Sequence, residues 1–385
     1  MAHLSYSTAG ESHGQALIAL IEGMPAGVTL DVDRINREMT RRQGGYGRGG
    51  RQGIEKDRVN ILSGVRKLVT IGSPIAVQIA NKDWRIDDAP PVHRPRPGHA
   101  DLAGSLKWLT TDCRAPLERA SARETAARVA AGAIARCLLN VFDIEIVGYV
   151  CRIGPVVAGI DAQASPAELT ARRDANEAYC PDAVVVDDMI AVIRQAMDDG
   201  DTIGGWVEVQ VHGLCPGLGS CSRWQDRLDG RLMRAVGSIQ AFKGVEIGGG
   251  FELGKLPGSQ VHDEIDYDPS LRETACLGFT RRSNRAGGLE GGMSNGQPLI
   301  VRGAMKPIST LVRGLDSVDL VTRQAARCDY ERSDVCAVPA ASVVAENVVA
   351  FEIARAFLEK FGGDTLDEVR AAYASYLRQA RELGD

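Results

Sequence analysis

The 385-residue sequence predicts an α+β fold in which antiparallel sheets pack around central helices. Short apolar runs bounded by turn-forming residues are typical of strands. A long alanine-rich segment with apolar residues at helical intervals indicates a buried helix. These segments follow one another without the regular alternation that a doubly wound parallel sheet requires. Length alone leaves the number of domains open.

The expected elements follow from the spacing of apolar residues. The first quarter of the chain is expected to be β-structure with loops, and residues 41–52 are expected to form a loop. Strands are expected at residues 16–22, 59–62, 75–79, 144–150 and 205–211. Helices are expected at residues 117–140, 187–197, 227–242 and, as the last one, 341–361.

Composition excludes several classes of protein. The net charge of -5 argues against a partner such as nucleic acid or an anionic membrane, which selects a basic surface. Nine cysteines without a CxxC pair indicate free thiols in a reducing compartment, so a cytoplasmic protein is expected. The N-terminus lacks the pattern of a signal peptide, and no run approaches the roughly 20 apolar residues of a membrane span.

A local anion site is predicted in the segment 41–52. It contains Arg41, Arg42, Arg48 and Arg51 among several glycines and has no acidic residue. Guanidinium groups bind phosphate and carboxylate through paired hydrogen bonds, and glycines let the backbone curl around a ligand. A solvated basic loop and an RGG-like contact with nucleic acid are the alternatives.

Two histidine segments provide candidate proton donors and acceptors. His13 lies between a serine and a glycine near the start of the chain, and a hydrogen-bonded turn histidine is the alternative there. Arg94, Arg96 and His99 lie in a segment that two prolines stiffen, which favours a preorganised site. An extended linker is the alternative for this second segment.

Three further segments carry candidate ligand contacts. Arg119, Ser121 and Arg123 cluster near a helix N-terminus, which favours phosphate, although surface salt bridges would also explain them. The glycine-rich segment 284–296 is explained equally well by backbone N–H groups that bind a ligand and by close packing between sheets. Near the C-terminal helix, Arg332 is a candidate phosphate contact, and Asp334 is a candidate acid or base unless it only pairs with Arg332.

As a set, these segments resemble the signature sequences of the chorismate synthase family, in the family's order and spacing from residue 7 to residue 364. The resemblance is carried by GESHG, GYGRGGR, RPRPGHAD, RASARETAARVAAG, QAFKGVEIG, NRAGGLEGGMSNGQP, MKPISTL and RSDVCAVPAA. It implies one domain over residues 1–385, a β-α-β sandwich of antiparallel sheets around central helices, and a homotetramer.

The resemblance also implies the reaction. The family eliminates phosphate from 5-enolpyruvylshikimate 3-phosphate in an anti-1,4 sense and forms chorismate, the last common step of the shikimate pathway to the aromatic amino acids. It needs reduced FMN although no net redox change occurs. Whether this chain reduces its flavin with NADPH or depends on another reductant stays open, because the sequence has no dinucleotide fingerprint.

Site residues carry over by their motif positions. The resemblance implies that His13 protonates the departing phosphate, that His99 holds the reduced flavin in its useful protonation state, and that Asp334 assists ring deprotonation through flavin N5. The implied substrate-binding residues are Arg42, Arg48, Arg51 and Arg123, of which Arg42 and Arg48 also correspond to nicotinamide-cofactor contacts. The implied FMN contacts are Arg119, Ala120, Ser121, Gln240, Ala241, Gly291, Lys306, Pro307, Ile308, Ser309, Thr310 and Arg332.

Two rival functions remain for the same residues. A metal-dependent phosphohydrolase would use His13, His99 and Asp334 as ligands, but no metal-ligand spacing supports it, so no metal is expected. A polyanion-binding protein would work through residues 41–51 and would bind nucleic acid with strong salt dependence. The acidic net charge counts against this second alternative.

Overall fold

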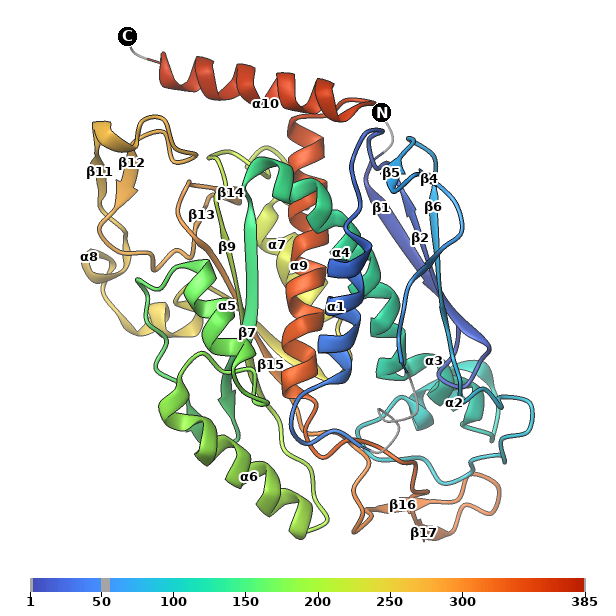
Figure 1. The fold of residues 1–385 in the computed structure, drawn as a ribbon. Coiled ribbons are helices and arrows are strands. Elements are labelled where there is room, and N and C mark those ends of the chain that lie inside the picture. The colour runs from blue at the N-terminus through green and yellow to red at the C-terminus, as the bar shows by residue number, and fades with distance from the viewer. Residues whose placement is uncertain (1–2, 50–55, 384–385) are drawn as a thin grey trace.

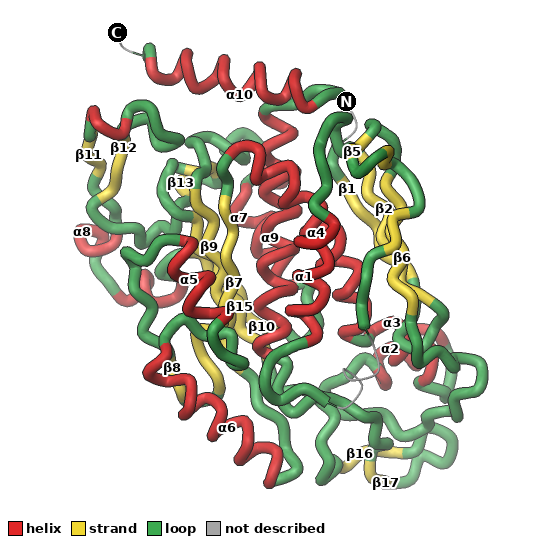
Figure 2. Tube along the Cα trace, viewed as in Figure 1, coloured by secondary structure: helices red, strands yellow, loops and turns green. Residues whose placement is uncertain are grey.

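The computed structural model describes residues 3–49 and 56–383. Two antiparallel sheets enclose a layer of helices, as Figures 1 and 2 show. One sheet has the strand order β1-β2-β6-β3 and the other has the order β10-β15-β9-β7-β8. The α+β sandwich expected from the sequence is therefore confirmed.

The strands of the two main sheets and of the small hairpins have the following bounds. The first sheet comprises β1 (Ser5–Ala9), β2 (Ala16–Glu22), β6 (Ile75–Ala80) and β3 (Asn60–Ile61). The second comprises β10 (Phe242–Ile247), β15 (Leu299–Met305), β9 (Gly205–His212), β7 (Glu145–Ile153) and β8 (Val156–Val157). The hairpins are β4 (Val65–Arg66) with β5 (Val69–Thr70), β11 (Ile265–Tyr267) with β12 (Phe279–Arg281), β13 (Leu289–Glu290) with β14 (Met293–Ser294), and β16 (Asp316–Val318) with β17 (Ala325–Arg327).

The helices lie between the sheets and around the rim. They are α1 (Val32–Gln43), α2 (Asp101–Trp108), α3 (Arg114–Ala120), α4 (Thr125–Leu139), α5 (Pro166–Asp174), α6 (Val186–Asp198), α7 (Leu228–Gly237), α8 (Gly258–Val261), α9 (Val338–Lys360) and α10 (Leu366–Arg381). In the space-filling view, α10 lies across one end of the molecule, and its Arg381 bonds to Arg272 of a neighbouring segment.

Helix α9 is the centre of the core. Of residues 338–357, all but Glu352 and Arg355 are buried. A helix that is apolar on every side must be surrounded by other elements. Helix α9 packs against α4, α1 and α7 on its helical side and against β7 and β9 on the other. The inner faces of both sheets are therefore covered by one shared helical layer.

Several sequence expectations about helices were wrong in their bounds. The segment 117–140 is interrupted at Ser121, whose extended backbone and side chain cap a short 3₁₀ turn before α4 begins. The helix expected at residues 227–242 ends at Gly237, and Phe242 already starts β10. The first quarter contains α1, which includes residues 41–43 of the expected loop. Residues 341–361 are not the last helix, because α10 follows α9.

The helical run from Arg114 to Phe142 passes a test of length and hydropathy for a membrane span, contrary to the expectation that no such run exists. In its most apolar window, 83% is buried inside the protein. Apolar residues on all sides are equally characteristic of a core helix. The burial of this run indicates a core segment of the helical layer between the sheets.

Helices α4 and α9 cross at Gly132. A Cβ atom added there would lie 2.1 Å from the main-chain oxygen of Asn347 on α9. No side chain can relieve this contact because a backbone atom makes it. The approach of the two helices thus depends on glycine at this position.

We predict that Gly132→Ala lowers stability by about 2 kcal/mol or more, since overpacking costs typically ~1–3 kcal/mol. Glycine to alanine in an open helix has the opposite sign, a gain of up to about 1 kcal/mol. Gly230→Ala on α7, where a Cβ meets nothing within 4 Å, is the matched control. Urea midpoints of the two variants would be compared with the parent, and a Gly132→Ala midpoint at or above the parental one would contradict the prediction.

A buried ionic cluster joins four helices around Glu346 of α9. Its carboxylate accepts hydrogen bonds from Arg136 of α4 at 2.7 Å, from Arg41 of α1 at 3.1 Å and from Arg173 of α5 at 3.3 Å. Burial alone would raise the pKa of Glu346, but the three guanidinium groups hold it well below its ordinary value of 4.5. The carboxylate is therefore ionised in the folded state at neutral pH.

We predict that Glu346→Gln destabilises the protein at pH 7 by about 3 kcal/mol or more, because breaking a buried ion pair leaves uncompensated charge. Because the pKa of Glu346 is depressed in the folded state, its ionisation stabilises the protein fully at pH values above the ordinary pKa of 4.5. This stabilisation is lost as the pH falls through the pKa of the folded state. The difference between parent and variant should therefore shrink in acid. Urea denaturation at pH 7 and at successively lower pH measures it, and a difference independent of pH would rule this account out.

Candidate active site

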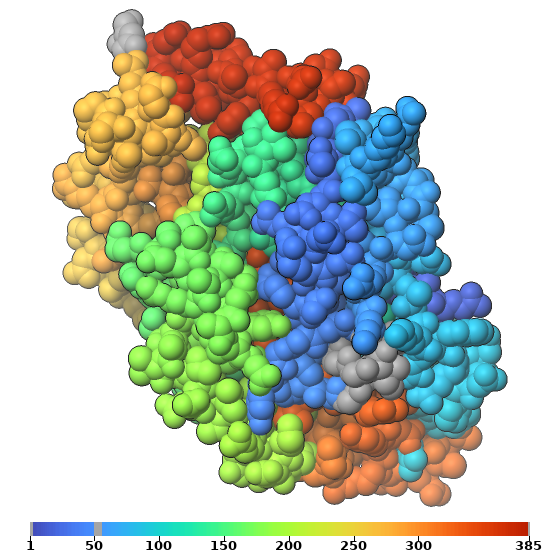
Figure 3. Space-filling view, viewed as in Figure 1, coloured from blue at the N-terminus to red at the C-terminus, as the bar shows by residue number. Residues whose placement is uncertain are grey.

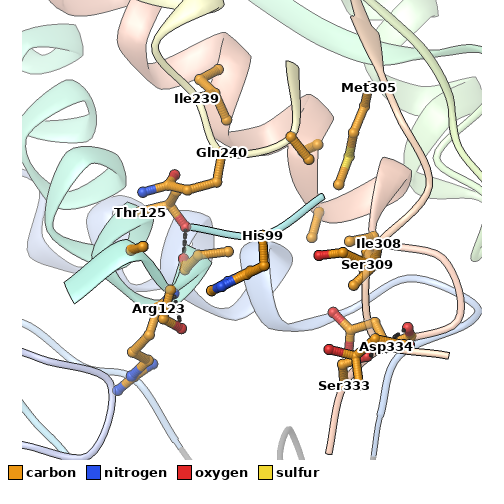
Figure 4. A pocket seen from close by; sticks show the side chains of 18 of the residues that line it. His99, Arg123, Thr125, Ile239, Gln240, Met305, Ile308, Ser309, Ser333 and Asp334 are labelled. Atoms are coloured by element: carbon orange, nitrogen blue, oxygen red, sulfur yellow. Dashed lines mark hydrogen bonds between the residues drawn. The ribbon is translucent and has the colours of Figure 1, made fainter. Parts of the chain in front are cut away.

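A cavity of about 520 Å³ opens at one end of the helical layer, next to the N-terminal end of α9. Its walls come from segments far apart in the sequence. They are the end of α1, the loop before α2, the 3₁₀ turn before α4, the turn between α7 and β10, the segment after β15 and the segment that leads into α9. Figure 4 shows His99 between Arg123, Thr125 and Gln240 on one side and Ser309 and Asp334 on the other. This volume is typical of sites for small ligands.

The cavity is strongly cationic. Among the described residues, the charged side chains that line it are Arg42, Arg48, Arg96, Arg123, Lys306 and Arg332 against the single carboxylate of Asp334. Burial lowers the pKa of Lys306, and the neighbouring Lys243 lowers it further. Arg42, Arg96 and Arg123 are buried, and such an excess of positive charge favours a ligand with several negative charges.

Two of these arginines share one buried counter-ion. The carboxylate of Asp57 lies 3.0 Å from Arg42 and 2.6 Å from Arg123, and all three side chains are almost fully buried. Burial lowers the pKa of Arg42 to about 10 although Asp57 opposes this. Burial would raise the pKa of Asp57, but the two arginines hold it below its ordinary value. One carboxylate against two guanidinium groups leaves a net positive charge facing the cavity.

Arg48 is held by Asp334 across the cavity mouth. Its Nη1 atom lies 2.5 Å from Oδ2 of Asp334, and the backbone N–H of Gly49 donates to Oδ1 at 2.7 Å. The backbone N–H groups of Val335 and Cys336 also donate to the carbonyl of Gly47. The glycine-rich segment after α1 is thus tied to the segment before α9, and Asp334 pairs with Arg48 rather than with Arg332.

His99 lines the cavity and is oriented by a buried ion pair. Its Nδ1 atom hydrogen-bonds to the carboxylate of Asp101, the first residue of α2, and lies 3.0 Å from Nη2 of Arg96. Arg96 in turn donates to Asp101 and, through Nη1, to the hydroxyl of Thr310 at 3.0 Å. The histidine segment is therefore linked to the segment 306–310 on the opposite wall.

His13 does not line this cavity. Its backbone N–H and its Nδ1 atom both hydrogen-bond to the buried carboxylate of Glu118 on α3, at 2.8 and 2.9 Å. Its Nε2 atom lies 3.9 Å from Asp83. Glu118 also lies 3.5 Å from Arg114, which reaches Glu331 at 2.9 Å. His13 is consequently fixed by a network beside α3.

The remaining cavity wall suits a flat ring system. Apolar side chains of Ile239, Met305, Ile308 and Val344 cover it. The buried Nε atoms of Arg42 and Arg48 and Oε1 of Gln240 lack hydrogen-bond partners among the described residues. Buried polar atoms normally have partners, so these atoms fit a ligand that carries both donors and acceptors. A flat ring with hydrogen-bonding groups at its edge and an anionic group beside it fits these two donors, this acceptor and the apolar wall.

The structure brings most of the expected site residues together. Those that line the cavity are Arg42, Arg48, His99, Ala120, Ser121, Arg123, Gln240, Ala241, Lys306, Ile308, Ser309, Thr310, Arg332 and Asp334. Four expected residues lie outside the lining, namely His13, Arg119, Gly291 and Pro307. Arg51 lies outside the described residues.

Two of the residues outside the lining have clear local roles. Arg119 donates to the carbonyl oxygens of Thr8 and Gly10 and so holds the segment that precedes His13. Gly291 lies in the turn between β13 and β14 with a φ of +60°, a conformation that favours glycine. In this chain that hairpin packs against Gly219 rather than against the cavity.

Sequence reasoning missed the buried carboxylates that orient the site. Asp101 ends the motif RPRPGHAD and Glu118 directly precedes the motif RASARETAARVAAG, but nothing in their spacing showed that each contacts a histidine. Asp57 follows the basic segment and carries no motif at all. A search for acidic residues close to each cationic motif would have selected these three positions as candidates.

No metal site is formed in residues 3–49 and 56–383, where no three His, Cys, Asp or Glu side chains group closely enough to hold an ion. His13 bonds to Glu118, whereas His99 bonds to Asp101 and Asp334 to Arg48. The alternative of a metal-dependent phosphohydrolase therefore has no ligand set in this part of the chain.

We predict that Asp334→Asn loosens the segment 44–49. The asparagine amide cannot accept from both Arg48 and Gly49, so the segment should open more often, and amide exchange of the peptide covering residues 44–49 should rise about tenfold for a loss of ~1.4 kcal/mol. Asp329→Asn, which removes the carboxylate paired with Arg94, is the control. Hydrogen exchange read by mass spectrometry tests this, and equal protection in both variants would refute it.

Comparison with known proteins identifies the family. The profile of the family described as chorismate synthase matches residues 4–358. Chorismate synthase of Desulforamulus reducens is 52% identical over 99% of this chain and 100% of its own length. That of Desulforudis audaxviator is 54% identical over 98% of both chains.

A solved structure agrees with these sequence relatives. A crystal structure of chorismate synthase is 40% identical to this chain, covers 99% of each chain and superposes with a TM-score of 0.81. Fold, sequence and the cationic cavity point to one conclusion. The chain belongs to the chorismate synthase family and has that family's function, as a lyase of the shikimate pathway that acts on a small molecule with the help of a reduced flavin.

Proposed function

We propose that the cavity binds 5-enolpyruvylshikimate 3-phosphate next to reduced FMN and that the chain catalyses the anti-1,4 elimination of phosphate. The observation that carries the proposal is the grouping of six basic side chains around a cavity with one apolar wall. The substrate has two carboxylates and a phosphate, and FMN adds a further phosphate and a ring system. No uncharged or cationic ligand would offset so much positive charge.

The arginines bind and orient the substrate. Arg42 and Arg123, placed by Asp57, and Arg48, placed by Asp334, offer guanidinium groups to its carboxylates and phosphate. We include Arg51 among these contacts on its motif position alone. Fixed donors around the departing phosphate stabilise the charge that develops on it. Such electrostatic stabilisation is the largest single contribution to the rate enhancement in many enzymes.

The flavin contacts lie along the other walls. We assign them to Arg119, Ala120, Ser121, Gln240, Ala241, Gly291, Lys306, Pro307, Ile308, Ser309, Thr310 and Arg332. Bound there, reduced FMN would provide an electron transiently and take it back, so that no net redox change occurs. Since Gly291 lies outside the cavity lining, we propose that its contact is made to the flavin of a second copy of the chain in a homotetramer.

Three residues handle protons. The C–O bond breaks with its electron pair on the phosphate, the ring loses a proton, and the electron pair left behind forms the new double bond. We assign proton transfer to the phosphate to His13, assistance of ring deprotonation to Asp334, and control of the protonation state in the cavity to His99. His13 lies outside the cavity lining, so its role requires the phosphate to reach beyond the lining or the segment 10–14 to move.

The wider setting follows from the same assignment. We propose one domain over residues 1–385, because the two sheets share a single helical layer. We further propose a cytoplasmic enzyme, since the nine cysteines are all free. NADPH is a candidate reductant for the bound flavin through Arg42 and Arg48. Nucleic acid and membranes are not proposed as partners.

The test is chorismate formation and phosphate release from 5-enolpyruvylshikimate 3-phosphate under anaerobic conditions with dithionite-reduced FMN. Turnover is expected with reduced FMN only. Oxidised FMN should not replace reduced FMN, and a metal chelator should not abolish turnover. Phosphate release that is independent of flavin and sensitive to chelator would overturn the proposal in favour of a hydrolase.

The same assay separates the site from the surface. Arg123→Ala should lower kcat/KM by roughly 10- to 100-fold, since a hydrogen bond to a charged group contributes ~1.5–3 kcal/mol. Arg223→Ala removes an arginine that is mostly exposed and paired with Asp226, and it should leave turnover unchanged. Equal effects of the two substitutions would contradict the placement of the substrate.

A further inference from the structure

A buried ion pair between Asp101 and Arg96 contacts His99. Asp101 has no exposed surface, and Arg96 is only 7% exposed. Oδ2 of Asp101 accepts from the backbone N–H of Arg96 at 3.0 Å and from its Nε at 2.8 Å, while Oδ1 accepts from Nη2 at 3.0 Å and from Nδ1 of His99. Asp101 is therefore the hydrogen-bond acceptor in each of these four contacts.

The carboxylate stays ionised. Burial would raise the pKa of Asp101, but the hydrogen bonds from His99 and Arg96 outweigh it and hold the pKa well below its ordinary range. An ionised carboxylate is an acceptor only. The proton in the contact with His99 must then lie on Nδ1. Nη2 of Arg96 lies 3.0 Å from Nδ1 of His99 because both atoms donate to the same oxygen of Asp101. They do not form a hydrogen bond with each other.

The backbone around the pair leaves it little freedom. Pro95 and Pro97 flank Arg96 and restrict the main chain on both sides. Asp101 is the first residue of α2, where the helix dipole favours a negative charge. Arg96 is anchored a second time by Thr310 on the opposite wall. The carboxylate is thus fixed relative to the cavity before any ligand binds.

From this geometry we infer that Asp101, supported by Arg96, is the positioning residue of the reaction: it fixes His99 as the Nδ1–H tautomer and presents Nε2 to the cavity. The inference rests on the proposed role of His99. Nε2 has no hydrogen-bond partner in the described part of the chain, while His99 lines the cavity with a side chain that is 21% exposed. Since Arg96 balances the charge of Asp101, the pair orients the ring without adding net negative charge to a site that binds anions.

A purely structural role makes a different prediction. If the pair only tied the segment 94–101 to α2, replacing Asp101 would loosen the segment but would not choose between the two ring nitrogens. An oriented tautomer has a specific consequence, because a neutral imidazole accepts a proton at one nitrogen and donates at the other. In serine proteases, the corresponding aspartate-to-asparagine change leaves the geometry intact but imposes the wrong tautomer and costs about 10⁴ in kcat.

The first experiment reads the tautomer directly and needs neither flavin nor substrate. Histidine ¹⁵N resonances are recorded on deuterated protein above neutral pH, and His99 is assigned by the signal lost in His99→Gln. In the parent protein His99 is expected as the Nδ1–H tautomer, and finding Nε2–H there would overturn the inference without any variant. In Asp101→Asn the Nε2–H form should appear, because the amide can donate to Nδ1.

The second experiment connects the tautomer to turnover. Asp101→Asn should lower kcat by a factor on the order of 10²–10⁴. The KM for the anionic substrate should change little, because Arg42, Arg48 and Arg123 do not contact Asp101. Asp101→Glu, which restores a carboxylate, should recover part of the loss. Asp329→Asn, in the neighbouring pair with Arg94, should change neither the tautomer nor kcat. A rise in KM with unchanged kcat in Asp101→Asn would refute a positioning role.

The two readouts separate the inference from the function on which it rests. If His99→Gln turned over normally, the proposed role of His99, and the catalytic part of this inference with it, would fall. If His99→Gln were inactive while Asp101→Asn kept both the Nδ1–H tautomer and full turnover, the role of His99 would stand and the inference would fall alone.

Discussion

The structure depends most on the charge of Glu346, buried where the helices of the central layer meet the second sheet. Arg41, Arg136 and Arg173 reach this one carboxylate from α1, α4 and α5. Because Arg41 is fixed there near the end of α1, the next residue, Arg42, must point away from it and into the cavity. A structural ion pair therefore sets the direction of a ligand-binding residue, and the helical layer and the site are built by the same contacts.

A second constraint is that the site must hold many cations before an anion arrives. Like charges in a low-dielectric interior repel strongly, and burying a cation without a partner is costly. Buried carboxylates pair with these cationic side chains. Asp57 pairs with Arg42 and Arg123, and Asp101 pairs with Arg96. The carboxylates do not neutralise the cavity, because the basic side chains outnumber them. The remaining charge is available to a polyanionic ligand.

The sequence predicted the architecture and the cavity segments better than the contacts among them. Apolar periodicity found the central helix and the long strands, since burial on one or all sides leaves that pattern. It missed the break at Ser121, where a side-chain cap overrides an alanine-rich helical pattern, and it missed α10, whose exposed face weakens the apolar signal. The motifs selected residues that converge on one cavity, but Asp57 meets Arg123 across 66 residues, and no local pattern records such a contact.

Two of the carboxylates that the sequence did not reveal have the same physical task. Asp101 and Glu118 each bond to Nδ1 of a histidine, and both are buried, Asp101 at the start of α2 and Glu118 in the last turn of α3. A neutral histidine can carry its proton on either ring nitrogen, so its motif cannot specify which nitrogen faces a ligand. The choice is made by a carboxylate whose own position is fixed by helix and ion pair. In this fold the chemistry of a motif residue is therefore determined by its buried neighbour, and the neighbour, rather than the histidine, shows which nitrogen is left for the reaction.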